Sequence, residues 1–417
     1  MKRMFCLWIL LVMAIATVIG CSSRSAEEVT TVTLSGWQSN PNETRLLEQV
    51  LNKFEATHPN IKVKHEVIND QYMDVIKTRL IGDAAPDVFY LDSFESTLLM
   101  KYDVLSPLDS YITSNFAAAD FESNLLAAFR YKGKIYGLPK DFSTLALFYN
   151  KKAFQEVGLT KAPATWDELL AYSKKLTLDT NRDGRIEQYG FGLAPELARQ
   201  YFMIKAFGGE LIDGHGNAAF ASPQSLKGLQ LVIEQYRKDK SSAQASDVGA
   251  SSGSEIFGQG KAAMVIEGSW AIPYLKETFP NIDFATAEVP TVGGKKGTIA
   301  YTVAYVMNKQ TKHKQAAWQL ISYLTGSEGM KAWASAGLAL PTRKSVVAAL
   351  GYDKKLLYAP FVAGAAYATI WQAGENLPTI ANNFNNQFVS ALIGEQSLQQ
   401  AMKQAQVTAN KEIQAAN

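Results

Sequence analysis

Strand-like and helix-like segments alternate from residue 29 onward, and this alternation constrains the fold more than any other feature of the sequence. Residues 29–35 and 61–67 have the β-branched, alternating pattern of strands, and residues 86–92 have that of a buried strand. Amphipathic helical patterns follow at Pro41 and over 72–80. Such alternation predicts parallel strands in an open α/β sheet, with a ligand bound beyond the carboxyl ends of the strands.

The rest of the chain continues this pattern, with one exception at 135–150. That stretch is strand-like but contains Pro139 and Asp141, and it is too long for one ordinary strand, so we expect a crossover between two lobes. Capping patterns begin helices at Thr165 and Ser222. We expect a surface loop over 240–254, strands over 262–267 and 300–307, and a helix over 315–324.

Size and composition allow more than one apolar core and exclude several classes of protein. The chain has 417 residues, of which 47% are apolar, so two globular lobes are expected. Lys and Arg number 41 against 39 Asp and Glu, which argues against a nucleic-acid partner.

The N-terminus has the pattern of an export signal. Lys2 and Arg3 precede an apolar run over 4–19 that ends in Gly20-Cys21. This end resembles the lipobox of bacterial lipoproteins, which implies cleavage after residue 20, acylation of Cys21 and a tether over 21–28. An uncleaved membrane anchor is the alternative. Either way, the body of the protein is expected outside the cytoplasm, and Cys21 would be the only cysteine left after cleavage, which excludes an intrachain disulfide and thiol catalysis.

Motifs of common enzymes are missing from the sequence. The four histidines are scattered without the spacing of metal ligands, and there is no phosphate-binding loop. Asp92 and Asp141 offer two carboxylates that a glycosidase could use, although carboxylates also bind sugars without cleaving them. We therefore expect no catalysis and keep a secreted carbohydrate-active enzyme as the alternative.

A segment over 179–187 matches the first half of a calcium-binding loop. Oxygen ligands are expected at alternate positions, namely Asp179, Asn181, Asp183, Arg185 through its carbonyl, and Glu187 as the closing carboxylate. The position that usually carries the bidentate glutamate is a glycine. A structural Ca²⁺ and an ion-free turn rich in Asp and Asn are both compatible with this sequence.

Several runs, taken in order, resemble one known family. They are PDVFYLD at 86–92, YGLPKDFSTLALFYNKKAF at 136–154, TWDEL at 165–169, AFGGELIDGHGNAAFASP at 206–223, MVIEGSW at 264–270 and LPTRKSV at 340–346. Together they are similar to the extracellular solute-binding proteins of ABC importers, in the branch of the maltose- and trehalose-binding proteins.

The resemblance implies the type II periplasmic-binding-protein fold, an α/β fold with two hinge-linked lobes that close over a ligand. Lobe 1 would comprise 29–142 and 300–342, and lobe 2 would comprise 143–299 and the C-terminal helices of 343–417.

Sugar binding is expected on chemical grounds as well, because pyranose rings stack on aromatic side chains and their hydroxyls bind carboxylates and amides. Strand ends supply such groups in Trp37, Gln38, Asp92, Glu95, Asp141 and Trp270. The resemblance places Asp92, Asp141 and Trp270 where family members bind glycans, and it adds Tyr301, Arg343 and Trp371 as secondary candidates. For Trp37 and Trp371, packing in a core is an equally good interpretation.

The sequence thus predicts a lipid-anchored, monomeric substrate-binding subunit of an ABC importer. Its partners would be a small carbohydrate, the membrane subunits of the transporter and the bilayer, and it would require no cofactor. Maltose, trehalose, sucrose and compatible solutes such as glucosylglycerol remain equivalent candidates. Binding of another solute, such as a peptide, remains a further alternative.

Overall fold

A computed structural model describes residues 29–38 and 41–416, and the predicted signal peptide, Cys21 and tether lie outside these described residues. One mixed sheet runs through the molecule in the order β2-β1-β3-β11-β6-β9-β7-β8, with β10 paired to β6 and β12 to β11. The strands are β1 (Thr30–Gly36), β2 (Ile61–Val67), β3 (Val88–Asp92), β6 (Gly137–Asn150), β7 (Phe191–Leu193), β8 (Ser242–Gln244), β9 (Met264–Gly268), β10 (Phe284–Ala287), β11 (Ile299–Met307) and β12 (Thr369–Ile370), with a separate hairpin of β4 (Arg130–Tyr131) and β5 (Lys134–Ile135).

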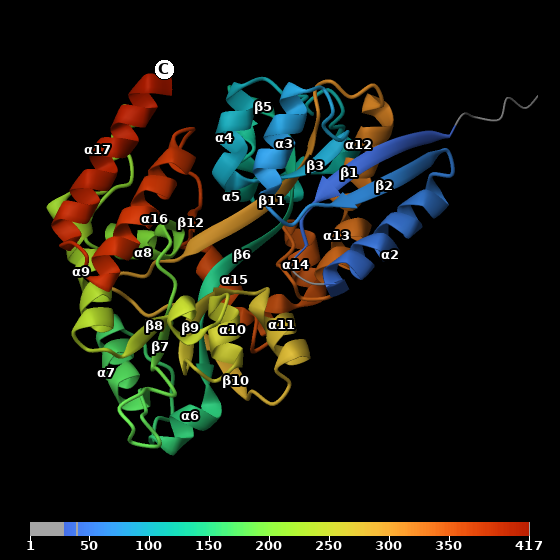
Figure 1. Cartoon of the computed structure of the whole chain (residues 1–417). Coiled ribbons are helices and arrows are strands. Elements are labelled where there is room, and N and C mark those ends of the chain that lie inside the picture. Colours follow the sequence, from blue (N-terminus) through green and yellow to red (C-terminus); the bar gives the residue numbers. More distant parts are fainter. Residues whose placement is uncertain (1–28, 39–40, 417) are drawn as a thin grey trace, which may run out of the picture.

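Two large apolar cores divide the elements into two lobes (Figure 1). The lobe 1 core lies around β1, β2 and β3, and it includes Phe54, Tyr90 and Ile321. The helices packed there are α2 (Pro41–Thr57), α3 (Tyr72–Ile81), α4 (Ser93–Lys101), α12 (Lys314–Leu324) and α13 (Ser327–Ala334).

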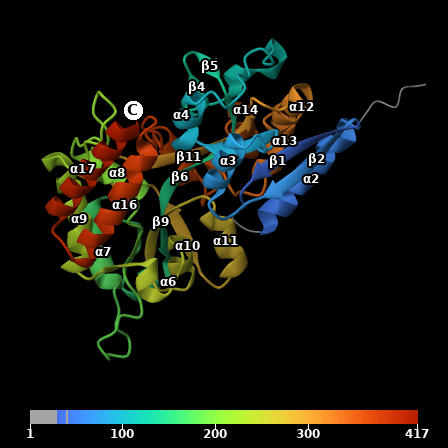
Figure 2. The ribbon, with the colours of Figure 1, turned by 45° about the horizontal axis from the view of Figure 1, so that its top comes forward.

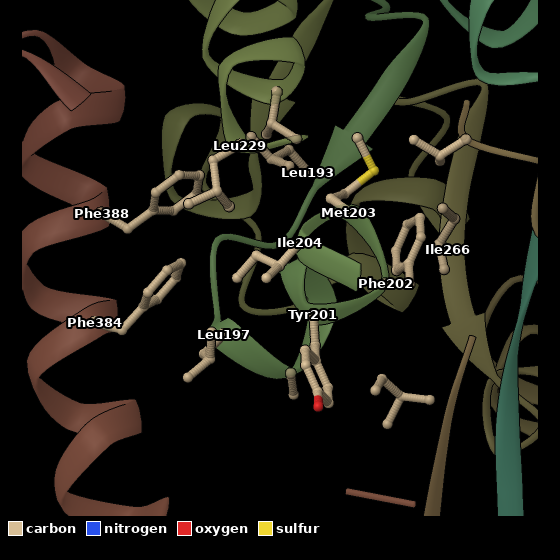
Figure 3. Close-up of a cluster of buried hydrophobic side chains, with 14 of the residues drawn as sticks. Leu193, Leu197, Tyr201, Phe202, Met203, Ile204, Leu229, Ile266, Phe384 and Phe388 are labelled. Atoms are coloured by element: carbon tan, nitrogen blue, oxygen red, sulfur yellow. The ribbon is translucent and has the colours of Figure 1, made fainter. Parts of the chain in front are cut away.

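Lobe 2 is built around β7 and β9 and is completed by the end of the chain. Figure 3 shows α8 (Leu197–Ala206) inside this core, with Phe384 and Phe388 pointing toward it from α16 (Leu377–Ile393). The other helices of lobe 2 are α6 (Lys151–Glu156), α7 (Trp166–Leu176), α9 (Pro223–Arg237), α10 (Gly253–Gly258), α11 (Ala271–Thr278) and α17 (Leu398–Ala416). Figure 2 shows α16 and α17 beside α8 and α9, and α16 also contacts α4 of lobe 1.

A smaller third core lies where the lobes meet. It joins Phe142 and Phe148 of β6 to Leu340 and Phe361. The short helices in this region are α5 (Ser123–Ala127), α14 (Lys344–Leu350) and α15 (Ala359–Ala365). The chain therefore passes between the lobes along β6, along β11 and again through the segment that contains these last two helices.

Strand β6 runs between the lobes at the position of the predicted crossover, and it is one continuous strand over fourteen residues in spite of Pro139. Its first half pairs with β11 and its second half with β9 and β10. Opposite β11, Asp141 pairs with Val303 and Pro139 pairs with Ala304, so Lys140 is an extra residue in β6. This β-bulge accommodates the proline, which lacks an N–H, and it bends the strand where it leaves lobe 1.

The predicted parallel pairing is confirmed within each lobe, since β1 pairs in parallel with β2 and β3, and β7 pairs in parallel with β8 and β9. It is wrong for β6 and β11, which run antiparallel to their neighbours and make the sheet mixed. The predicted loop over 240–254 is also wrong, because β8 and the start of α10 lie within it. The Thr165 cap is confirmed, and Glu168 reaches back to the N–H of Ala164.

Within the described part of the chain, no helix combines the length and apolar character that spanning a bilayer requires.

Candidate functional site

A cavity of about 380 Å³ lies between the lobes, beside the shared strands β6 and β11. Six of the predicted binding residues line it: Trp37, Asp92, Asp141, Trp270, Tyr301 and Trp371. Its other walls come from Glu43, Ser93, Phe94, Lys140, Phe142, Ser143, Thr302, Val303, Trp333, Leu338 and Ala339. The cavity thus draws on both lobes and on the strands that join them.

Aromatic rings from lobe 2 and from β11 form one side of the cavity. Trp270 follows β9 and lies edge to face with Tyr301, with ring centroids 5.9 Å apart. The Trp270 ring lies directly over Gly268, where an added Cβ would approach ring carbons to 2.1 Å. The glycine is therefore needed for the ring to face the cavity.

A second pair of rings joins the lobes at the cavity wall. Phe94 of α4 and Trp371, which follows β12, are stacked with an interplanar angle of 8° and centroids 5.7 Å apart. The Trp371 carbonyl also accepts a hydrogen bond from Ser93 Oγ at 3.0 Å. Trp371 is 7% exposed, so it both packs in the lobe 2 core and borders the cavity.

Trp37 follows β1 and is held by edge-to-face contacts with Tyr72 and Tyr90, at centroid distances of 5.0 and 5.3 Å. These two rings orient the indole while leaving it partly exposed at the cavity. Trp37 therefore combines the two roles that the sequence left open, since it packs on the lobe 1 core and lines the cavity.

Asp141 is bound through one of its two oxygens to a cation and an indole. Lys140 forms an ion pair with Oδ2, and Trp333 Nε1 donates to the same oxygen at 2.8 Å. The Lys140 ammonium also lies over the rings of Trp333 and Tyr90, 4.1 and 4.7 Å from their centroids. The bulge in β6 brings two consecutive residues, Lys140 and Asp141, to the cavity.

Asp92 ends β3 and caps α4, accepting a hydrogen bond from the Glu95 N–H at 2.9 Å. Desolvation raises the pKa of Asp92 to about 6, although hydrogen bonds from the first turn of α4 oppose this rise. Asp92 therefore takes up a proton closer to neutral pH than an ordinary aspartate does.

Three predicted binding residues do not line the cavity. Gln38 donates its backbone N–H to Asn69 Oδ1 at 3.1 Å, and Glu95 turns toward α3, where it pairs with Lys77 at 2.8 Å.

Arg343 is buried and acts as a structural tie instead of facing the cavity. Its guanidinium donates to the carbonyls of Thr325, Ala117 and Phe116 and pairs with Asp120. Because these groups of the same chain satisfy its charge and its donors, Arg343 does not line the cavity, in contrast to its prediction as a binding residue.

The cavity residues that were not predicted as binding residues include Glu43, Lys140 and Trp333. Glu43 lies in the first turn of α2, directly beyond the end of β1, so the strand-end rule that selected Trp37 could have found it. No local sequence pattern identifies Lys140 or Trp333. Lys140 is the extra residue of the bulge in β6, and Trp333 binds Asp141, which lies 192 residues away in the sequence.

The predicted calcium loop lies in lobe 2, and none of its residues lines the cavity. Carboxylate oxygens of Asp179, Asp183 and Glu187 lie within 4.8 Å of one another. Asn181 and Asp183 accept hydrogen bonds from backbone N–H groups of the same loop, and Glu187 accepts from the Thr180 N–H at 2.6 Å. The three carboxylates therefore lie close together, and hydrogen bonds within the loop also hold its shape.

Comparison with known proteins identifies the family. Residues 40–331 match the family model of the bacterial extracellular solute-binding proteins. The chain is 27% identical over 283 residues to a putative binding protein of Brucella abortus, covering 66% of this chain and 67% of the relative. It is 25% identical over 333 residues to the multiple sugar-binding protein of Streptococcus mutans, covering 74% of each chain.

Solved structures have the same two-lobed fold. An ABC substrate-binding protein of Listeria monocytogenes, in complex with cycloalternan, superposes with a TM-score of 0.85 at 22% identity, covering 93% of this chain and 100% of the other. A solute-binding protein of Thermotoga lettingae, bound with α-D-tagatose, gives a TM-score of 0.82 at 25% identity, covering 92% and 99%. These relatives are binding proteins and not enzymes, and the family match spans well over half of the sequence. The chain belongs to the bacterial extracellular solute-binding protein family.

Proposed function

We propose that this protein binds a small oligosaccharide or glucoside in the interlobe cavity and delivers it to an ABC importer. The observation that carries the proposal is one cavity lined both by the rings of Trp270 and Tyr301 and by the carboxylates of Asp92 and Asp141. Rings of this kind stack on the apolar face of a sugar, and ionised carboxylates accept hydrogen bonds from its hydroxyls. Compatible solutes such as glucosylglycerol offer the same groups.

The names of the relatives support a sugar as the ligand. One relative is the multiple sugar-binding protein of Streptococcus mutans, and another is the maltotriose-binding protein of Pyrococcus abyssi, 25% identical over 298 residues.

Closure of the lobes would convert binding into a signal for the transporter. A ligand that contacts Asp92 from lobe 1 and Trp270 from lobe 2 gains contacts only when the lobes approach, so it stabilises the closed state by that difference. The shared strands β6 and β11, with the bulge in β6, are where such a hinge motion would bend.

Titration calorimetry with a saccharide panel, combined with small-angle scattering, tests the proposal. A saccharide ligand should release or absorb heat and reduce the radius of gyration. Flat titrations with every saccharide, together with a thermal shift from peptides, would indicate a different solute. Turnover of labelled glycosides would instead indicate an enzyme.

Binding should depend on pH through Asp92. Because burial raises the pKa of Asp92 in the folded protein to about 6, the protonated form of Asp92 stabilises the folded state. This stabilisation is fully present below the pKa of Asp92 in the unfolded chain, and it is lost as the pH rises through 6. Affinity should run the opposite way, since the ionised form accepts the hydroxyl bonds. We expect about a tenfold loss of affinity between pH 7 and pH 5 by calorimetry.

The matched variant for this prediction is Asp92→Asn, which keeps the shape and cannot ionise. Its affinity should be weaker at pH 7 and should no longer change between pH 5 and pH 7. A pH dependence that persists in Asp92→Asn would assign the titration to another group.

We also propose that the protein is exported and held at the membrane as a monomer by acylated Cys21, next to the membrane subunits of its transporter. The basic residues, apolar run and Gly-Cys at the N-terminus support this proposal. Mass spectrometry of the N-terminal peptide tests it, and an unmodified Cys21 in the native host would contradict it.

For the loop over 179–187 we propose a structural Ca²⁺ held by Asp179, Asp183 and Glu187, with Asn181 and the Arg185 carbonyl as further oxygens. At a Ca²⁺ concentration 100-fold above Kd, the bound ion would stabilise the native state by about 2.7 kcal/mol. The melting temperature should therefore rise when CaCl2 replaces EDTA, and Asp183→Asn should reduce this rise. An identical melting temperature in both buffers would make the loop an ion-free turn.

A further inference from the structure

A second chamber borders Trp270. It has a volume of about 480 Å³, and Trp270 is the one residue that lines both this chamber and the interlobe cavity, so the two spaces lie next to each other at Trp270. Each space alone is in the range of about 300–1,000 Å³ that is typical of small-molecule sites. The chamber is lined by Ala194, Glu196, Arg199, Ser251, Ser252, Gly253, Ser254, Glu267, Trp270 and Tyr274.

The chamber lies on the ligand-binding edge of lobe 2. Its residues come from the segments that follow β7, β8 and β9, or from the end of β9 itself. These three strands are parallel, so their carboxyl ends meet at one edge of the sheet. Trp270 stands at the same edge, which makes the chamber a continuation of the cavity along lobe 2.

A mostly buried ion pair lines the chamber. Arg199 donates to the Ile266 carbonyl at 2.7 Å and pairs with Glu267 at 3.1 Å. Burial opposes the charge of Arg199, but the adjacent carboxylate of Glu267 raises its pKa overall. The guanidinium carbon lies 5.9 Å from the centroid of the Trp270 ring.

Gly253 leaves room for the carboxylate of this ion pair. A Cβ at Gly253 would lie 2.2 Å from Glu267 Oε1, so only glycine lets the carboxylate reach the chamber wall. The side chains of Glu267 and Arg199 are 5% and 17% exposed. These two groups are therefore preorganised, and a ligand that binds them need not order long flexible side chains.

The chemistry of the chamber suits a neutral, hydroxyl-rich group. The Arg199 charge is balanced by Glu267, and Glu196 adds a second carboxylate, so an anionic ligand gains no net attraction. The serine hydroxyls at 251, 252 and 254 add donors and acceptors, while Trp270 and Tyr274 offer apolar ring surface. Another sugar unit presents both kinds of partner.

We infer that the chamber binds a further sugar unit of the ligand, so that the protein prefers oligosaccharides of three or more units over disaccharides. This inference rests on the proposed function, because the first units must occupy the interlobe cavity. Trp270 would then contact the ligand on both sides.

Calorimetry with a length series tests the inference, using maltose, maltotriose and maltotetraose, and likewise mannobiose, mannotriose and mannotetraose. In a series that binds, the longest member should bind at least tenfold more tightly than the disaccharide. Ser251→Trp, which fills the chamber from an exposed position, should remove this gain and leave disaccharide affinity within twofold. Glu196→Trp should do the same from the segment that follows β7, which covers the case in which Ser251→Trp disturbs α10.

Ser246→Trp is the matched control, since Ser246 is also exposed and lies outside both spaces. It should leave the affinity for every saccharide unchanged, and circular dichroism should show all three variants folded. Equal affinity for all lengths, or a gain that survives both blocking variants, would overturn the chamber as a subsite while the proposed function stands. No binding by any member of either series would remove support from both.

Discussion

Trp270→Ala should weaken saccharide binding by roughly 30- to 1000-fold. The indole lines the interlobe cavity and is in edge contact with Tyr301, so a sugar ring stacked on it would lose its platform. Central aromatic residues of binding sites typically contribute about 2–4 kcal/mol, and about 1.4 kcal/mol corresponds to a factor of ten. Titration calorimetry against the saccharide that the panel identifies gives the change directly.

Trp166→Ala is the matched control for this prediction. Trp166 is 4% exposed in the lobe 2 core and does not line the interlobe cavity. Its removal should lower the free energy of unfolding by about 3–5 kcal/mol and leave saccharide affinity unchanged wherever the variant is folded. Trp270→Ala should show the reverse pattern, because its ring is only partly buried.

Gly268→Ala separates the position of the Trp270 ring from its presence. The added methyl group would lie 2.1 Å from ring carbons, so the indole must move away from its place above the strand. We expect a loss of affinity close to that of Trp270→Ala. If both variants retain full affinity and Trp270→Ala unfolds easily, Trp270 is a core residue and not a sugar platform.

Much of the fold was predictable because it depends on local patterns. The strand β2 and the buried strand β3 end where the sequence predicts, and Asp92 therefore lies at the sheet edge. The strand-end rule placed Trp37 and Trp270 at the cavity for the same reason.

The unpredicted features all depend on contacts between distant segments. Pro139 suggested a break, whereas pairing with β11 keeps β6 continuous and absorbs the extra residue as a bulge. Arg343 looked like a binding residue, but the carbonyls that it contacts lie at 116, 117 and 325. Similarly, the partner of Arg199 is Glu267, 68 residues away. A pattern in neighbouring residues cannot reveal contacts between segments that lie this far apart in the sequence.

Asp141→Ala should have the largest combined effect, because it removes a ligand acceptor and isolates a buried cation. Lys140 is 5% exposed at its side chain, and its carboxylate partner is Asp141. Breaking a buried pair from one side typically costs about 3–5 kcal/mol, since the remaining charge is left uncompensated. We expect the free energy of unfolding, measured in urea, to fall by that amount, and saccharide affinity to fall with it.

The double variant Lys140→Met/Asp141→Asn separates the two effects. It removes both charges and keeps side chains of similar size, and replacement of a whole buried pair is often close to neutral for stability. The amide oxygen introduced by Asp141→Asn could still accept a hydrogen bond from Trp333, which donates to Asp141 at 2.8 Å in the native protein. The free energy of unfolding should therefore recover.

Affinity should not recover in the double variant, because a neutral amide accepts hydroxyl bonds less strongly than a carboxylate whose other oxygen is already fixed by Lys140 and Trp333. Trp333→Phe should give an intermediate affinity, since it keeps an aromatic ring beneath Lys140 and removes only the bond that orients the Asp141 carboxylate. Recovery of stability together with full affinity in the double variant would show that Asp141 serves the hinge and not the ligand.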